Sequence, residues 1–229
     1  MVENVVFQED ITTQSVANLM SYLDDYTRGV TLDGQPIEIP EKIILNFSTN
    51  GGSYSAIMML VDYINQYPLD LEVVVFDHCC SAGMLFLMFI DVNIRILKSG
   101  YGMFHLVDMP LSARELRDKA SASAWYQKDL RNCDEFFIKE YEKCSLTYDE
   151  LRLIKDGKDV YVDSARLMEC ISSYRAFMNV KEIDARIEDI EFEKSMLSEE
   201  KESYIKQIEE IKALQVKPVK KFKKKKHDK

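Results

Sequence analysis

A serine stands between two apolar runs at a point in the sequence where a hydroxyl could be activated as a nucleophile. Ser81 closely follows the run Leu71–Phe76 and directly precedes the run Ala82–Ile90. At the start of a helix, free backbone N–H groups and the helix dipole both favour developing negative charge. The same position suits an N-cap, for which serine is a preferred residue. This segment alone is therefore compatible with either a nucleophile or a cap.

His105 is the histidine best placed to act as a base for this serine. The chain has three histidines, of which His78 is almost adjacent to the serine and His227 lies near the C-terminus. Activation of serine requires a neutral imidazole within hydrogen-bond reach of the hydroxyl, although a histidine in an apolar strand is often a core residue. Asp159 could accept a hydrogen bond from the far ring nitrogen, and Asp156 competes with it for that role.

Small residues at two places could supply N–H donors to a developing oxyanion. Gly51 and Gly52 follow the apolar run Lys42–Phe47, and two glycines there can expose N–H groups towards a bound backbone. They could equally form only a turn. Ala82 directly follows the serine, and with Gly83 it would let a substrate carbonyl approach the backbone closely.

The segment before the serine contains residues that could suggest a different chemistry. Asp77, His78, Cys79 and Cys80 are all potential metal ligands, but adjacent residues cannot all converge on one ion. No second pair at zinc-site spacing accompanies them, so we predict no metal and no other cofactor. Cys80 is an alternative nucleophile, although the flanking residues fit Ser81 better.

Strand and helix patterns alternate along the first part of the chain. Apolar runs of strand length and stretches of helical spacing predict strands at Val5–Phe7, Lys42–Phe47, Leu71–Phe76, Asn93–Leu97 and Met103–Val107, helices at Val16–Thr27, Ala56–Tyr67, Ala82–Ile90 and Ala113–Lys143, and a strand–helix segment at Val160–Ser172. This alternation indicates an α/β fold with a parallel sheet covered on both faces. Ligand sites in such sheets lie beyond the C-terminal ends of the strands, which is where Gly52 and Ser81 fall.

Four segments in order resemble the Clp protease proteolytic subunits. Phe47–Ser53 resembles their N-S-P-G-G-S turn, Cys80–Gly83 their A-S-M-G nucleophile turn, Gly102–His105 their V-M-I-H and Asp159–Ala165 their D-x-F-L-S-A segment. The order serine, histidine, aspartate is that of the family and differs from the order in α/β-hydrolases. The resemblance covers residues 5–176 and is to a distant member, such as the Clp-like proteases encoded by bacteriophages.

This resemblance implies a fold, an activity and a set of roles. The fold would be a crotonase-like, Clp-like spiral of ββα units with Ala113–Lys143 as a handle helix, through which rings of seven stack face to face. The activity would be that of a serine endopeptidase that cleaves polypeptides through an acyl-enzyme, with an ATP-driven unfoldase as partner. The implied roles are nucleophile for Ser81, base for His105, orientation of that base for Asp159, and oxyanion donors for Gly52 and Ala82.

Two alternatives to a peptidase stay open. A crotonase-fold enzyme acting on acyl-CoA would share the oxyanion donors, but would normally place a carboxylate where this chain has serine and histidine. An inactive Clp-like assembly or scaffold protein would need no chemistry. After His105 the chain reads Leu106–Leu111, without the glycine pair that the family has there, and this difference favours the scaffold alternative.

The C-terminal part has a different composition. We predict a Clp-like domain at residues 1–179, a charged coiled-coil helix at 180–216 and a disordered lysine-rich tail at 217–229. Steps of three and four, typical of a heptad seam, separate the apolar residues Ile183, Ile187, Ile190, Leu197, Tyr204, Ile208 and Ile211, with Lys194 and Lys201 also on the seam. We expect self-association or a partner helix; the alternative is a single helix packed on the domain.

Charge and apolar content limit the partners and the compartment. The net charge is −9 although the tail carries eight lysines and one aspartate, so nucleic acid could bind only through the tail. The run Met84–Ile90 is too short to cross a bilayer and no secretion signal is visible, which predicts a cytoplasmic protein without a membrane partner. Five cysteines without framework spacing predict free thiols. The layout is also similar to phage capsid-maturation proteases, for which capsid or scaffold proteins and the host cytoplasm would apply.

Overall fold

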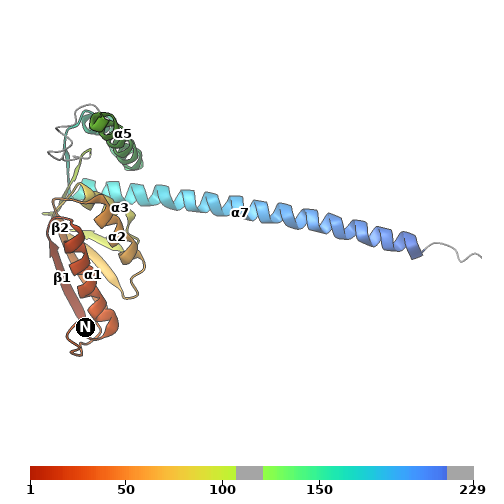
Figure 1. Ribbon diagram of the computed structural model, residues 1–229, viewed down its shortest axis with the longest axis horizontal. Coiled ribbons are helices and arrows are strands. Elements are labelled where there is room, and N and C mark those ends of the chain that lie inside the picture. The colour runs from red at the N-terminus through yellow and green to blue at the C-terminus, as the bar shows by residue number, and fades with distance from the viewer. Residues whose placement is uncertain (107–120, 216–229) are drawn as a thin grey trace, which may run out of the picture. The chain divides into compact units, whose positions relative to one another are not determined.

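In the computed structural model, which describes residues 1–106 and 121–215, a sheet of six strands organises the first part of the chain (Figure 1). The strands are β1 (Val2–Gln8), β2 (Lys42–Thr49), β3 (Leu71–Cys80), β4 (Asn93–Ile96), β5 (Tyr101–Phe104) and β6 (Val160–Asp163). Their order in the sheet is β1-β2-β3-β5-β6, and β4 pairs with β3 off this path. Strands and helices alternate from β1 to β4, and the protein has a mixed α/β architecture with a long C-terminal helix.

The helices largely follow the predicted pattern. They are α1 (Thr13–Arg28), α2 (Tyr54–Asn65), α3 (Ala82–Phe89), α5 (Ser121–Tyr141), α6 (Tyr148–Lys155) and α7 (Ser164–Gln215). The first eight residues of the predicted helix at 113–143, and the predicted tail, lie outside the described residues. Helix α6 was not predicted, although its start carries a capping box in which Thr147 and Glu150 satisfy each other's backbone N–H groups.

The prediction of a wholly parallel sheet is wrong at one edge. Strands β1 to β5 pair in parallel, but β6 runs antiparallel to β5 with Tyr101 opposite Asp163 and Phe104 opposite Val160. The apolar pattern of a four-residue strand carries no information about its direction. The long segment between β5 and β6, which includes α5 and α6, lets the chain return in the opposite direction.

Strand β3 is the element that positions the candidate nucleophile. Its first half, Glu72–Val75, pairs with β4, and its last residues, His78–Cys80, pair with β5. The strand therefore extends four residues beyond the predicted end at Phe76. This extension carries Ser81 to the end of β5, where its N–H donates a hydrogen bond to the Met103 carbonyl at 3.0 Å.

Helix α3 is a central part of the hydrophobic core, to which the sheet and the other helices of the first unit also contribute. Phe47 on β2 stacks on Phe7 with ring centroids 5.1 Å apart and contacts Phe86 of α3 at 4.6 Å. Every residue of α3 from Ala82 to Met88 is buried, as expected for a helix that is apolar on all sides. Each large apolar side chain buried in this way contributes about 1.5–3 kcal/mol to folding. The packing makes α3 a rigid support for the residue that precedes it.

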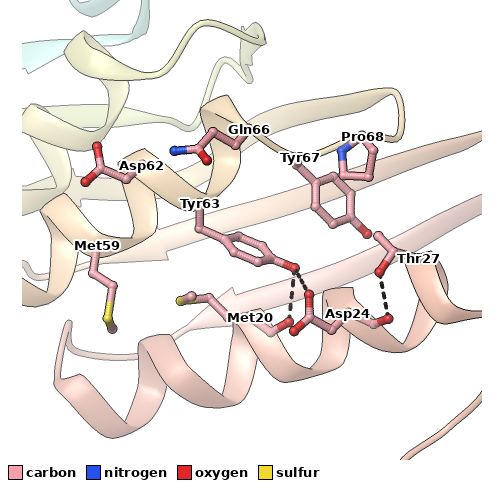
Figure 2. A pocket seen from close by; sticks show the side chains of 9 residues that line it. All are labelled: Met20, Asp24, Thr27, Met59, Asp62, Tyr63, Gln66, Tyr67 and Pro68. Atoms are coloured by element: carbon pink, nitrogen blue, oxygen red, sulfur yellow. Dashed lines mark hydrogen bonds between the residues drawn. The ribbon is translucent and has the colours of Figure 1, made fainter.

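Helices α1 and α2 are joined by tyrosine hydroxyls, as Figure 2 shows for Tyr63. The Tyr63 hydroxyl donates to the Asp24 carboxylate at 2.6 Å and also lies 3.2 Å from the Met20 carbonyl. Tyr67, just after the end of α2, donates its hydroxyl to the Leu23 carbonyl of α1 at 2.8 Å. Burial, together with the neighbouring Asp24 carboxylate, raises the pKa of Tyr63. These bonds hold the two helices in a fixed relation to each other.

The chain divides into two compact units, Met1–Phe177 and Met178–Lys229. The second unit is described as far as residue 215 and consists of the C-terminal part of α7. All five cysteines are free thiols, as predicted. Among residues 1–106 and 121–215, no helix is both long and apolar enough to cross a membrane.

Candidate active site

Ser81 occupies the junction between β3 and α3 in a strained backbone conformation. Its φ of 54° and ψ of −121° make it the only non-glycine residue with positive φ in the described part of the chain. Such a conformation costs on the order of 1–3 kcal/mol and persists only where the surrounding structure imposes it. Ser81 stands at the N-cap position of α3, but its hydroxyl accepts no hydrogen bond from the helix and so does not act as a cap.

The Ser81 hydroxyl instead faces His105. Nε2 of His105 lies 2.6 Å from Ser81 Oγ, which is a short hydrogen bond. His105 directly follows β5, and its carbonyl accepts a hydrogen bond of 3.2 Å from the Tyr141 hydroxyl on α5. Tyr141 is fully buried and packs edge-on against Phe104. The buried tyrosine thus holds the backbone that carries the histidine.

Asp159 is the carboxylate on the other side of the imidazole. Its Oδ1 lies 3.8 Å from His105 Nδ1, which is too far for a hydrogen bond, and its side chain is 50% exposed. Asp156, the competing candidate, is the exposed C-cap residue of α6, where its backbone N–H donates to Arg152 and Ile154. Of the two aspartates, the structure brings Asp159 to the histidine.

The turn at Gly51 and Gly52 lies against the candidate nucleophile. The two glycines have φ values of 106° and 142°, and a Cβ on Gly51 would come within 2.5 Å of Ser81 Cβ. The turn is held by hydrogen bonds from Ile11 N–H to the Gly51 carbonyl and from Gly51 N–H to Thr49 Oγ1, at 2.7 and 3.0 Å. The close approach and the positive φ together explain why this position is glycine.

Four of the five residues proposed from sequence line one cavity, and Asp159 is not among its lining residues. It has a volume of about 290 Å³ and is lined by Asn50, Gly52, Tyr54, Ser81, Ala82, His105 and Phe137. Ile11 forms backbone hydrogen bonds with the Gly51 carbonyl and the Ser53 N–H, the groups on either side of Gly52. The Gly52 N–H itself does not bond to Ile11. Ala82 N–H is the first of α3, where no preceding turn of helix supplies an acceptor. Both N–H groups are therefore suited to bind an anionic oxygen in this cavity.

The alternative groups near Ser81 are less suited to reaction. Burial raises the pKa of Cys80 to about 11, and burial raises the pKa of Cys79 well above its usual range. Since the thiolate is the nucleophilic form, neither thiol competes with the serine near neutral pH. His78 lies in β3, with Nδ1 2.9 Å from the Asp77 carboxylate and 3.2 Å from Ser48 Oγ. Within the described residues, no cluster of three or more histidines, cysteines or acidic residues could hold a metal ion.

A somewhat larger cavity, of about 370 Å³, lies elsewhere in the domain and lacks these groups. Figure 2 shows it beside α1 and α2, where its lining includes Met59, Asp62 and Tyr63. No serine, cysteine or histidine is among the residues that line it. We therefore place the candidate chemistry in the smaller cavity at Ser81.

Three aromatic residues of the site were not predicted from the sequence. Tyr54 and Phe137 line the cavity, and Tyr141 bonds the His105 carbonyl. The four-residue spacing of Phe137 and Tyr141 places both on one face of α5, which was the available signal. Comparison with known proteins adds no assignment, because no protein-family model and no curated protein matches the sequence.

Proposed function

We propose that the protein is a serine endopeptidase of the Clp proteolytic-subunit type. The observation that carries this proposal is the 2.6 Å contact between Ser81 Oγ and His105 Nε2. The contact lies in a cavity that Gly52 and Ala82 also line. A nucleophile, a base and two backbone donors at one cavity are the parts that acyl transfer requires.

The reaction follows from these positions. Ser81 Oγ attacks the substrate carbonyl carbon while His105 Nε2 takes its proton, and the oxyanion binds the N–H groups of Gly52 and Ala82. His105 then gives the proton to the leaving amine, which leaves an acyl-enzyme on Ser81. In the second half, His105 takes a proton from water, whose oxygen attacks the acyl carbon, and the proton returns to Ser81. The Asp159 carboxylate stabilises the imidazolium in both halves.

The architecture of the Clp family is part of the proposal. Two features support a crotonase-like spiral. Strands and helices alternate in the order β1-α1-β2-α2-β3-α3-β4, and β3 pairs with β4 along its first half and with β5 at its end. Helix α5 would be the handle through which sevenfold rings stack. The substrates would be polypeptides, delivered by an ATP-driven unfoldase or, in a phage, belonging to a capsid or its scaffold.

A second candidate function is assembly without catalysis. It is favoured by the 3.8 Å separation of Asp159 from His105 and by the half-exposed state of this carboxylate. In an inactive Clp-like subunit or scaffold, Ser81 and His105 would remain only as structure. An acyl-CoA enzyme, the remaining alternative, would bind coenzyme A.

Labelling with a fluorophosphonate probe tests the peptidase proposal. We expect a single adduct on the folded protein, mapped to Ser81 by peptide mass analysis, because the probe reacts only with an activated hydroxyl. The protein unfolded in urea should take up no probe, since the histidine contact is then lost. Hydrolysis of a casein or peptide substrate should disappear in parallel with labelling. Absence of any adduct on the folded protein would favour the assembly function, and tight binding of coenzyme A would favour the acyl-CoA enzyme.

Replacing Asp159 by asparagine is expected to lower the rate of hydrolysis about 10²-fold, at the low end of what an acid–base group contributes. The effect should be moderate because this carboxylate is 3.8 Å from His105 and half exposed, so that water screens its charge. Asp156→Asn is the matched control and should retain parental activity. Steady-state kinetics on one peptide substrate would measure both variants. Equal losses in the two would contradict the assignment of Asp159.

A further inference from the structure

An apolar stripe runs along the C-terminal unit of α7. Its seven apolar members are each between 48 and 65% exposed; they are Ile183, Ile187, Ile190, Leu197, Tyr204, Ile208 and Ile211. They recur at alternating steps of three and four residues and so lie on one side of the helix. Charged residues occupy most of the remaining surface. A helix with an uncovered stripe of this kind gains stability when another helix covers it.

We propose that a second copy of this chain covers the stripe, by pairing through α7 as a parallel, in-register, two-stranded coiled coil. In heptad terms, Ile187 and Ile208 are a positions, and Ile183, Ile190 and Ile211 are d positions. The same repeat places Lys194 and Lys201 at the two a positions between them. Pairing through α7 is a property of assembly and does not depend on the peptidase function.

The charges beside the seam match this orientation. Glu193 and Glu200 occupy the g positions directly before the two seam lysines. In a parallel pair the g side chain of one helix flanks the a side chain of the other, so each lysine meets a glutamate of the second copy. Arg186, another g residue, faces Glu191 of the second copy at the next e position. The like charges of facing lysines are thereby offset by opposite charges on both sides.

The other arrangements fit less well. In the antiparallel register that overlaps the whole stripe, Glu193 of one copy faces Glu200 of the other, and this repulsion occurs twice. Isoleucine at both a and d would favour three or four strands. However, three strands would bring three ammonium groups together at Lys194 and again at Lys201, which disfavours the larger bundles.

Disulfide trapping of single-cysteine variants of the full chain tests the orientation. In the parallel pair, the cysteines introduced by Ile183→Cys in the two copies lie beside each other and should form a disulfide under mild oxidation, which gives a covalent dimer. In the full antiparallel overlap the two cysteines would be about 37 Å apart, at about 1.5 Å per residue. Ser195→Cys, at a b position outside the seam, is the matched control and should stay monomeric on a denaturing gel. Both variants should carry Cys133→Ser, since Cys133 is the native thiol that is not buried. Failure of Ile183→Cys to cross-link overturns the proposal.

Sedimentation of charge and seam variants tests the contacts. Ile187→Asp with Ile208→Asp should reduce the mass of the particle at least twofold, whereas Phe192→Asp with Met196→Asp, at least as exposed but off the seam, should leave it unchanged. Glu193→Lys with Glu200→Lys should weaken association at least tenfold, and adding Lys194→Glu with Lys201→Glu should restore it. Equal effects of the seam and off-seam pairs, or no rescue by the charge exchange, would overturn the proposal. Helical content by circular dichroism shows that each variant remains folded.

Discussion

Replacing Ser81 by alanine or by glycine is expected to lower peptide hydrolysis at least 10³-fold, because both variants lack the attacking oxygen. His105→Ala should have a comparable effect, since the hydroxyl at 2.6 Å would lose its proton acceptor. The double variant Ser81→Ala/His105→Ala should be no slower than either single variant, because the two side chains act as a unit. Initial rates on one peptide substrate compare the four variants with the parent protein. Additive losses in the double variant, or activity retained by Ser81→Ala, would contradict the assignment.

The two Ser81 variants should differ in stability although both are inactive. Alanine keeps a Cβ at φ 54°, whereas glycine adopts positive φ without steric cost. Relief of this strain should add on the order of 1–3 kcal/mol to the free energy of unfolding. Glycine also makes the unfolded chain more flexible, which lowers the free energy of unfolding by only about 0.4–1 kcal/mol. We therefore expect Ser81→Gly to be about 1 kcal/mol more stable than Ser81→Ala in urea unfolding. A glycine variant no more stable than the alanine variant would show that the junction is not strained.

Substitution of Gly51 by alanine is expected to have the largest effect on the fold among the variants considered. The added Cβ would lie 2.5 Å from Ser81 Cβ and 2.9 Å from the Cys80 carbonyl oxygen, in a residue with φ 106°. Neither neighbour can move without displacing the end of β3. Steric overlap and backbone strain together should cost about 2–4 kcal/mol, with loss of activity because Ser81 is pushed away from His105.

Gly157→Ala is the matched control for this substitution. Gly157 also has positive φ, at 74°, but a Cβ there would meet no atom within 4 Å. Its cost should therefore be the conformational cost alone, about 1 kcal/mol, with activity retained. Urea unfolding and peptide hydrolysis of the two variants separate the steric cost from the cost of positive φ. Similar behaviour of the two variants would mean that Gly51 does not lie against Ser81.

Local signals in the sequence determined most of the elements and the candidate residues. Continuous apolar runs predicted β2 and α3, and the turn formers after β2 predicted the glycine turn, because these patterns depend only on near neighbours in the chain. The positions of Ser81 and His105 relative to these elements made them candidates for one site, whereas the choice of Asp159 over Asp156 depended on the resemblance to the Clp proteolytic subunits. The alternation of strands and helices likewise predicted the α/β class.

Only the tertiary structure decided how these candidates meet. Strand β3 reaches Cys80 because its end pairs with β5, a segment about twenty residues further along the chain. This pairing brings Ser81 Oγ to 2.6 Å from His105 Nε2, while the Asp159 carboxylate stays 3.8 Å from His105 Nδ1. The direction of β6 and the support of His105 by Tyr141 also depend on long-range contacts. Apolar periodicity records which side of an element is buried, but not which other element buries it, so distances between side chains on different strands arise only from packing.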